Sequence, residues 1–270
     1  MKITFLGGGN MANALIGGML DQGFAAEDIR VVELNADNRE ALRRNYGVSC
    51  LGEAEPRTWA ADLVVLAVKP QQMREAIQPL KRHLHEQLVL SIAAGLRLET
   101  LSRWLGGYRR LVRTMPNTPA LIGAGVTGLV ALPEVDEVGR LAAERVMKSV
   151  GSTLWVDDEA RMDGVTAVSG SGPAYVFLFI EALQEAAREQ GFDADDAARL
   201  AIETVLGAAR LAAQSDVSAA TLRERVTSKG GTTEAALRVM AEAGVKAGIL
   251  AGARAAAARG RELGDLLGAE

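Results

Sequence analysis

A glycine-rich turn near the start of the chain, GGGNMA at 7–12, has residue types that can bind a dinucleotide. Gly7 permits a tight turn, Gly9 lets the backbone approach a pyrophosphate, and Ala12 is small where a helix meets a strand. Free N–H groups at the start of the following helix would favour the phosphates. A turn without a ligand needs similar glycines. The position of this turn, directly after the first apolar run, favours dinucleotide binding.

Glu33 ends the second apolar run, at the spacing of about 20 residues where dinucleotide-binding folds place an acid on the ribose 2′-OH. A carboxylate there favours NADH, because it repels a 2′-phosphate. The alternative is that Asn35 and Arg39 receive the phosphate of NADPH while Glu33 turns aside. The sequence leaves both open.

Two proline-containing segments follow later predicted strands. In AVKP at 67–70, Lys69 stands where the carboxyl edge of a parallel sheet binds cofactor or substrate. A solvated lysine before a helix-initiating proline is the plainer interpretation of that segment alone. In MPNTP at 115–119, the two prolines hold Asn117 in a fixed orientation, as a purely structural turn would also do.

Two turns in the second half combine glycine with hydroxyl side chains: SGSGPAY at 169–175 and TSKGGTT at 227–233. Each is typical of a helix start, with Pro173 near the first helical position of one of them. Their exposed N–H groups could bind a small carboxylate. Simple helix capping is the alternative, but two such turns favour an anion site.

Several kinds of chemistry have little support in the sequence. His83 and His85 are the two histidines, and both lie in a polar stretch typical of a solvated loop. Cys50 is the single cysteine, so an intrachain disulfide and a thiolate metal cluster are excluded. No HExxH, nucleophile-elbow or Walker sequence occurs, so we predict no metal site and no hydrolytic triad.

The first half of the chain alternates apolar runs with helical patterns. Continuous apolar runs at 3–6, 29–34, 63–68 and 88–92 are typical of strands buried on both faces of a parallel sheet. Helical patterns lie at 10–21, 37–45 and 71–83, and further strands are expected at 111–113, 126–129 and 154–156, with a helix at 135–148. This order predicts an α/β fold: an N-terminal Rossmann-type doubly wound sheet.

After about residue 157 the strand signal ends, and helices are expected at 157–190, 193–214, 219–226 and 233–267. We therefore predict a dinucleotide-binding domain at 1–157 and an all-helical domain for substrate binding and dimerisation at 158–270. The alanine-rich stretch 247–258 suits close helix packing between subunits, although an internal helix pair needs the same small residues.

The composition limits the kinds of binding partner that are expected. Basic and acidic residues, 30 and 34, are mixed along the chain and give a net charge of −4, so neither nucleic acid nor an anionic membrane is expected as a partner. The N-terminus turns to glycine before a signal-peptide core could develop, and the apolar run 174–180 is too short to span a bilayer. We expect a cytoplasmic protein.

The chain resembles the pyrroline-5-carboxylate reductase family along nearly its whole length. The motifs, in family order, are GGGNMA at 7–12, AVKPQ at 67–71, SIAAG at 91–95, MPNTPA at 115–120, VSGSGPAY at 168–175 and VTSKGGTT at 226–233. The resemblance implies hydride transfer from NADPH or NADH to a small cyclic imine carboxylate, giving proline. It also implies a homodimer or a larger homo-oligomer built from dimers.

The resemblance also implies site residues. The cofactor-binding set is Leu6, Gly7, Gly8, Gly9, Asn10, Met11, Ala67, Val68, Lys69 and Pro70, to which we add Glu33 and Asn117. The substrate-binding set is Glu159, Ser171, Gly230, Gly231, Thr232 and Thr233. Backbone N–H groups would hold the carboxylate, and the Thr233 hydroxyl, the expected catalytic group, would lie near the ring nitrogen.

Two positions depart from the family pattern. Lys229 stands where many members have proline, and Glu33-Leu34 replaces the small or basic residues common in members that prefer NADPH. A protonated imine accepts hydride readily and can take its proton from water, so the chemistry needs no buried histidine.

Two other classes of protein share part of this pattern. A β-hydroxyacid-type dehydrogenase shares the layout but typically uses a helix lysine, and the segment 173–190 contains none. A dinucleotide-sensing protein without activity would be expected to lack the hydroxyl-rich loop, whereas Gly230 to Thr233 are all present.

Overall fold

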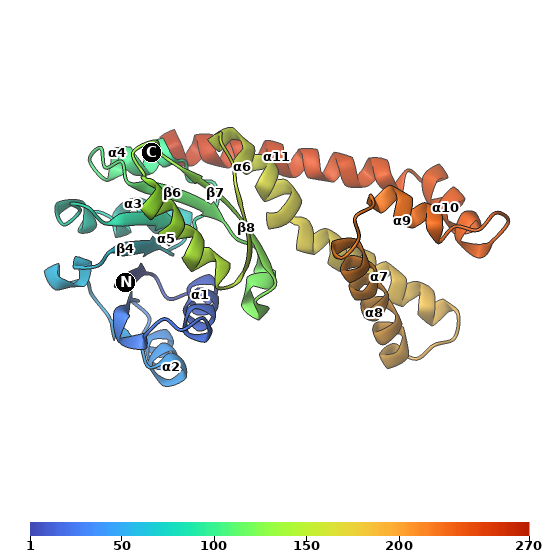
Figure 1. Cartoon of the computed structure of the whole chain (residues 1–270), viewed down its shortest axis with the longest axis horizontal. Coiled ribbons are helices and arrows are strands. Elements are labelled where there is room, and N and C mark those ends of the chain that lie inside the picture. Colours follow the sequence, from blue (N-terminus) through green and yellow to red (C-terminus); the bar gives the residue numbers. More distant parts are fainter. Residues whose placement is uncertain (270) are drawn as a thin grey trace. The chain divides into compact units, whose positions relative to one another are not determined.

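The computed structural model describes residues 1–269, and its N-terminal part is built on one eight-stranded sheet (Figure 1). The strand order is β3-β2-β1-β4-β5-β6-β7-β8. The strands are β1 (Ile3–Leu6), β2 (Ile29–Val32), β3 (Ser49–Leu51), β4 (Leu63–Leu66), β5 (Leu88–Ser91), β6 (Leu111–Met115), β7 (Gly125–Ala131) and β8 (Gly151–Trp155).

The centre of the sheet forms as the apolar runs predict. Every residue of β1, β4 and β5 is buried, because helices cover both faces of these strands. From β1 the chain winds outward in one direction to β2 and β3 and in the other to β4, β5 and β6, all parallel. The order therefore reverses between β1 and β4, which is the ligand-binding position of a doubly wound sheet.

Strand β7 runs antiparallel to β6, and β8 is parallel to β7. The four runs predicted to be parallel are so, and the sequence does not predict a direction for these two later strands. A short 3₁₀ turn, Thr118–Ile122, is all that lies between β6 and β7, and it is too short for the helical crossover that a parallel pair requires.

Helices cover both faces of the sheet and separate its core into two clusters (Figure 1). One cluster includes Leu15, Leu42 and Val146, from the three helices on one face, and the other includes Met73 and Leu101, from the two helices on the opposite face. The helices, in that order, are α1 (Asn10–Asp21), α2 (Ala36–Tyr46), α5 (Glu137–Lys148), α3 (Pro70–Ala76) and α4 (Leu98–Trp104).

Helix α7 (Gly172–Glu189) begins within the SGSGPAY segment, as the sequence suggested, but a π turn precedes it, so this start is not a free helix N-terminus. Helix α6 (Met162–Val165) passes into a π-helical turn, η6 (Thr166–Gly170), and then into α7. The N–H of Ser171 donates to the carbonyl of Thr166, so it is used within the helix and is not free to bind an anion. A π turn of this kind is rare and is often found at functional sites.

Two compact units make up the chain: residues 1–171 with 256–270, and residues 172–255. The predicted boundary between residues 157 and 158 stays a prediction. The second unit contains α7, most of α11 and three helices between them, α8 (Ala194–Ala213), α9 (Ala219–Arg225) and α10 (Thr232–Glu242). Gly191 and Gly244 adopt positive φ between helices.

The end of helix α11 (Val245–Ala269) packs within the first unit. Arg97, before α4, pairs with Asp265 at 2.7 Å, and Gly264 is buried against Arg97 and the carbonyl of Gly95. The C-terminal turns are thus fixed to the α4 region.

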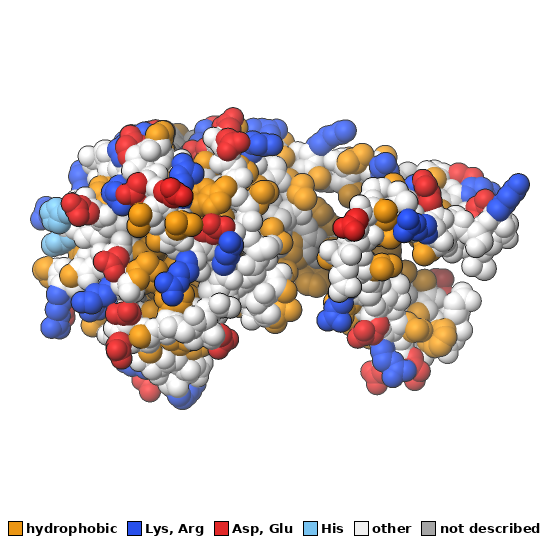
Figure 2. All heavy atoms as spheres, viewed as in Figure 1, with side chains coloured by type: hydrophobic (Ala, Val, Ile, Leu, Met, Phe, Trp, Pro, Cys, Tyr) orange, Lys and Arg blue, Asp and Glu red, His pale blue; other side chains and the backbone are white. Residues whose placement is uncertain are grey.

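Helix α7 has no buried residue, although it is strongly apolar. Phe177 and Phe179 are 63% and 47% exposed, and hydrophobic side chains are visible on the surface of the second unit (Figure 2). A helix with such a surface needs a further partner to cover it.

Candidate functional site

The turn after β1 requires glycine at two successive positions. Gly7 has φ +104°, and a Cβ there would lie 2.7 Å from the carbonyl oxygen of Ala67 on the neighbouring β4 segment. A Cβ on Gly8 would lie 2.7 Å from Leu42, so this glycine lets α2 pack close to the turn. Both contacts are with the protein itself. Gly7 and Gly8 are therefore needed for the fold of the turn itself, whereas the third glycine, Gly9, leaves space for a ligand.

Gly9 is exposed, and a Cβ built on it meets nothing within 4 Å. It is the N-cap of α1 and offers no side-chain cap. The first N–H groups of α1, at Asn10 and Met11, therefore face an open approach at the positive end of the helix dipole. This open cradle fits the pyrophosphate of a dinucleotide.

Glu33 joins the glycine turn to the β2–α2 turn. Its Oε2 accepts the N–H of Gly8 at 2.7 Å, and its Oε1 accepts the N–H of Asn35 at 2.8 Å. The carboxylate is thereby fixed beside the switch point with its negative charge partly exposed. Asn35 in turn caps α2 through its side chain, which accepts the N–H of Asn38.

A cavity of about 480 Å³ opens beside this turn. It is lined by Leu6, Gly7, Gly9, Val32, Glu33, Leu34, Asn35, Asn38, Glu53, Ala54, Ala67, Val68, Lys69, Gln72, Ala76 and Pro79. Seven of the expected cofactor residues are therefore brought together here. Gly8, Asn10 and Pro70 are chain neighbours of lining residues, and Met11 is two residues beyond Gly9. The cavity spans the strand reversal, where a dinucleotide binds in this type of sheet.

Lys69 and Pro70 begin helix α3 at the carboxyl edge of β4. Lys69 is the N-cap and Pro70 occupies the first turn, where its missing N–H costs nothing. Since β1 separates β2 from β4, Lys69 and Glu33 approach the cavity from opposite sides of the glycine turn.

Asn117 does not line the cavity. Its Oδ1 accepts the N–H of Val126 at 2.8 Å, and its Nδ2 donates to the carbonyl of Ser169 at 3.1 Å. This amide ties β7 to the π turn, and a Cβ on the neighbouring Gly170 would lie 2.6 Å from Met115. The MPN segment and the π turn thus pack as one unit, and a contact of Asn117 with cofactor stays a proposal.

Glu159 is held by two groups that lie far from it in the sequence. Its Oε1 accepts the N–H of Leu98 at 2.8 Å and the guanidinium of Arg113 at 2.9 Å. Arg113 is 4% exposed and Glu159 is 24% exposed. Arg113 was not among the residues predicted from the sequence, although a charged residue within an apolar strand indicates a buried partner.

The segment from Gly230 to Thr233 forms the start of α10 in the second unit. Gly230 adopts φ +73°, Gly231 is the N-cap, and Thr232 and Thr233 are the first helical residues. The N–H of Gly230 already donates to Oε2 of Glu234 at 2.7 Å. The N–H groups at the start of the helix are the remaining donors suited to a carboxylate. Here the sequence predicted the helix start to within one residue.

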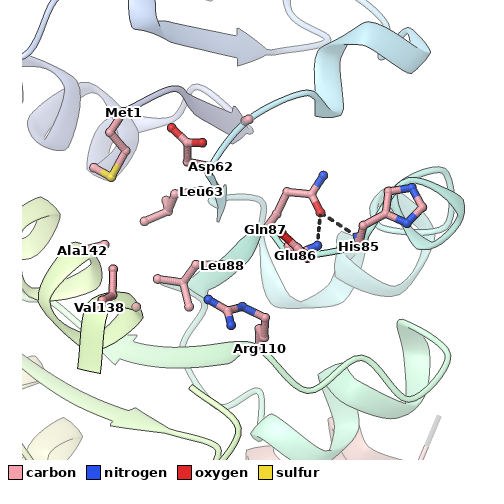
Figure 3. A pocket seen from close by; sticks show the side chains of 12 residues that line it. Met1, Asp62, Leu63, His85, Glu86, Gln87, Leu88, Arg110, Val138 and Ala142 are labelled. Carbon is pink, nitrogen blue, oxygen red and sulfur yellow. Dashed lines mark hydrogen bonds between the residues drawn. The ribbon is translucent and has the colours of Figure 1, made fainter. Parts of the chain in front are cut away.

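A second hollow of about 540 Å³ lies at the opposite, amino edge of the sheet (Figure 3). Asp62, Leu88 and Arg110 line it, together with the start of α5. It contains none of the expected site residues. Within residues 1–269, no three His, Cys, Asp or Glu side chains gather as a metal-ligand set.

A doubly wound sheet with an open glycine-rich turn, a cavity at its strand reversal and a fixed acid at the end of β2 defines a nicotinamide-dinucleotide oxidoreductase. Comparison with known proteins narrows this class. Residues 2–95 match the family model described as NADP oxidoreductase coenzyme F420-dependent, and residues 159–263 match the model for pyrroline-5-carboxylate reductase dimerisation.

Relatives match along nearly the whole chain. Pyrroline-5-carboxylate reductase from Pseudomonas aeruginosa is 44% identical over 99% of this chain and 98% of its own. The structure of a pyrroline-5-carboxylate reductase from Coxiella burnetii matches with a TM-score of 0.92 and 41% identity, covering 97% of this chain and 98% of that one. The Plasmodium falciparum pyrroline carboxylate reductase with NADP bound matches with a TM-score of 0.87 and 27% identity over 98% of each chain.

This chain belongs to the pyrroline-5-carboxylate reductase family. The membership confirms the resemblance that the motifs indicated, the Rossmann-type fold and the helical dimerisation domain. It also accounts for helix 159–189, whose most apolar window reaches a mean hydropathy of 1.2 with 6% of it buried. That helix passes a length-and-composition test for a membrane span, but it lies within the matched dimerisation domain and is not one.

Proposed function

We propose that this chain reduces 1-pyrroline-5-carboxylate to L-proline with NADPH or NADH as hydride donor, the last step of proline biosynthesis. Family membership supports the reaction. The observation that carries it for this chain is the intact Gly-Gly-Thr-Thr start of α10. That segment combines free N–H groups with two hydroxyls, which suits a small ring carrying a carboxylate and a nitrogen.

The start of α10 recognises the substrate carboxylate. Helical N–H groups in its first turn have no partner further back in the helix, and the helix dipole favours an anion there. The Gly230–Glu234 hydrogen bond fixes the preceding turn, so these donors are oriented before substrate arrives.

Thr233 acts on the ring nitrogen. Its side chain is half-buried in the first turn of α10, next to the proposed carboxylate site. The hydroxyl accepts a hydrogen bond from a protonated imine and so orients the electrophilic carbon beside it. The proton comes from solvent, and the protein needs no histidine for this step.

Glu159 and Ser171 complete the proposed substrate contacts. Glu159 is held by Arg113 and Leu98, so its carboxylate has a fixed direction. Ser171 immediately follows the π turn, which sets its side chain off the regular helical repeat.

The glycine turn and the AVKP segment hold the cofactor. Gly9 and the first N–H groups of α1 would receive the pyrophosphate, and Glu33 would face the adenosine ribose. When bound, the reduced nicotinamide supplies the hydride that the imine carbon accepts. Residues of this chain orient the two reactants and exclude water.

We further propose a homodimer, or a larger assembly of dimers, in which the exposed apolar side chains of α7 are covered by a second copy. The setting is the cytoplasm, and the mixed surface charge argues against nucleic acid or membrane as a partner.

The proposed reaction has a defined product and stoichiometry. Purified protein incubated with 1-pyrroline-5-carboxylate and a limiting amount of reduced donor should form one L-proline per donor oxidised. Amino-acid analysis measures the proline, and absorbance measures the donor. Donor oxidation without proline would rule the proposal out.

A further inference from the structure

We propose that the ribose end of the cofactor cavity selects a donor without a 2′-phosphate, so that this enzyme uses NADH in preference to NADPH. The discriminating groups are the carboxylates of Glu33 and Glu53, while the Arg39 guanidinium is occupied by backbone carbonyls and does not line the cavity. The inference rests on the proposed function only in that the chain uses a reduced nicotinamide donor.

Glu33 is fixed in the position that meets the adenosine ribose. The N–H groups of Gly8 and Asn35 hold its two oxygens at 2.7 and 2.8 Å, so the carboxylate cannot swing away without breaking both bonds. The sequence alone left open whether Glu33 turns aside. These two hydrogen bonds keep the Glu33 side chain from turning aside.

The charge around this end of the cavity is acidic. Among the described residues that line it, the charged ones are Glu33, Glu53 and Lys69. Lys69 belongs to the β4 side, and β1 lies between it and Glu33, a separation of about 10 Å across two strand spacings. Its charge therefore serves the pyrophosphate side and not the 2′ position.

The two arginines of α2 closest to this end of the cavity are hydrogen-bonded to backbone carbonyls. Nη1 of Arg39 donates to the carbonyl oxygens of Glu33 and Leu34 at 2.8 and 2.7 Å, and its guanidinium packs against Gly52. Nη2 of Arg43 donates to the carbonyl of Cys50 at 2.7 Å. Neither arginine lines the cavity.

Hydrogen-bond chemistry also favours NADH over NADPH. A ribose 2′-OH donates to a carboxylate, whereas a phosphate monoester carries a charge of about −1.5 to −2 and no comparable donor. Replacing the hydroxyl by phosphate removes a favourable bond and adds a like charge beside Glu33. We expect at least tenfold weaker binding of NADPH, with the difference shrinking as salt screens the repulsion.

The experiment is calorimetric titration of the full-length protein with NADH and with NADPH, without imine substrate, at low and high salt. The wild type should bind NADH at least tenfold more tightly, and Glu33→Gln should reduce that ratio at least fivefold. Glu53→Gln should reduce it by a smaller factor. Glu40→Gln, which removes the same charge from the outer side of α2, should leave the ratio unchanged.

Equal or tighter binding of NADPH by the wild type would overturn the inference. So would an unchanged ratio in Glu33→Gln, with its fold checked by circular dichroism. If that variant fails to fold, the wild-type ratio and Glu53→Gln decide the matter. A protein that prefers NADH in binding but forms no proline would retain this inference and lose the proposed reaction.

Discussion

Nη1 of Arg113 on β6 lies 2.9 Å from Oε1 of Glu159, and the same oxygen accepts the N–H of Leu98 at the start of α4. This pair connects the sheet to the segment that leads into the π turn. A buried guanidinium in the middle of a strand is tolerated because the carboxylate compensates its charge.

Removing Glu159 should therefore affect stability. Glu159→Ala leaves Arg113 buried without a counter-charge and should lower the free energy of unfolding by about 2–4 kcal/mol, measured by urea denaturation. Glu159→Gln keeps an oxygen for both N–H donors and should lose clearly less. Glu262→Ala, which breaks an exposed pair with Arg259, is the control and should change stability little. Equal stability of the Ala variant and wild type would show that the pair has no structural role.

The glycines of the turn should separate folding from binding. Gly7→Ala forces a Cβ against the Ala67 carbonyl at positive φ and should destabilise the protein by about 2 kcal/mol or more. Gly9→Ala meets open space and should fold nearly normally, yet bind the donor at least fivefold more weakly, because the methyl group occupies the phosphate approach. Thermal unfolding and donor titration measure the two effects. Unimpaired donor binding by Gly9→Ala would place the pyrophosphate elsewhere.

Asn117 bridges β7 and the π turn, and it is largely buried. Asn117→Ala leaves the N–H of Val126 and the carbonyl of Ser169 without that partner and should cost about 1–3 kcal/mol of stability. Denaturation curves measure this loss. A fully stable variant with weakened donor binding would mean that the amide serves the cofactor alone.

The exposed apolar surface of α7 should be a subunit interface. Phe177→Glu places a charge on that surface and should shift the protein from dimer toward monomer in sedimentation experiments. Val138→Glu is the matched control on α5, where the side chain is 75% exposed in the other unit. An unchanged assembly in the Phe177 variant would move the interface away from this part of α7.

Acid should destabilise the sheet domain around α5. The Gly139 N–H lowers the pKa of Asp136, and the Arg109 guanidinium lowers the pKa of Glu134. A carboxyl whose pKa is lower in the folded state stabilises the protein above its unfolded pKa and loses that contribution as pH falls through the folded value. The melting temperature should therefore decrease as the pH is lowered below about 4. This decrease should be smaller in the Asp136→Asn variant. An identical acid profile in the variant would contradict this.

The sequence predicted the central strands well, because β1, β4 and β5 are buried on both faces and so are continuously apolar. It missed β3, which is three residues long and lies at the sheet edge with Ser49 exposed. It also missed the seven-residue helix α4. The hydrophobic pattern of β7 does not show that this strand runs antiparallel to β6.

For the site, local motifs were informative and long-range partners were not. The glycine turn and the start of α10 are short segments whose local conformation follows from residue type. The Arg113–Glu159 pair joins residues 46 positions apart. Glu53 lines the cavity just after β3, a strand that the sequence did not reveal. The π turn before α7 was missed because small residues at a helix start and in a π turn have the same composition.

Thr233→Ala tests the assignment of the substrate nitrogen. Loss of the hydroxyl should lower kcat/KM by one to two orders of magnitude, if the bond contributes about 1.5–3 kcal/mol, while Thr233→Ser should retain most activity. An unchanged kcat/KM in the Ala variant would remove Thr233 from the mechanism.

The most direct measurement is the rate of reduced-donor oxidation by the purified wild type, with and without 1-pyrroline-5-carboxylate, using NADH and NADPH in parallel. The account predicts rapid oxidation that depends on the imine and is faster with NADH. Folded protein that binds donor but oxidises neither one in the presence of the imine would contradict it.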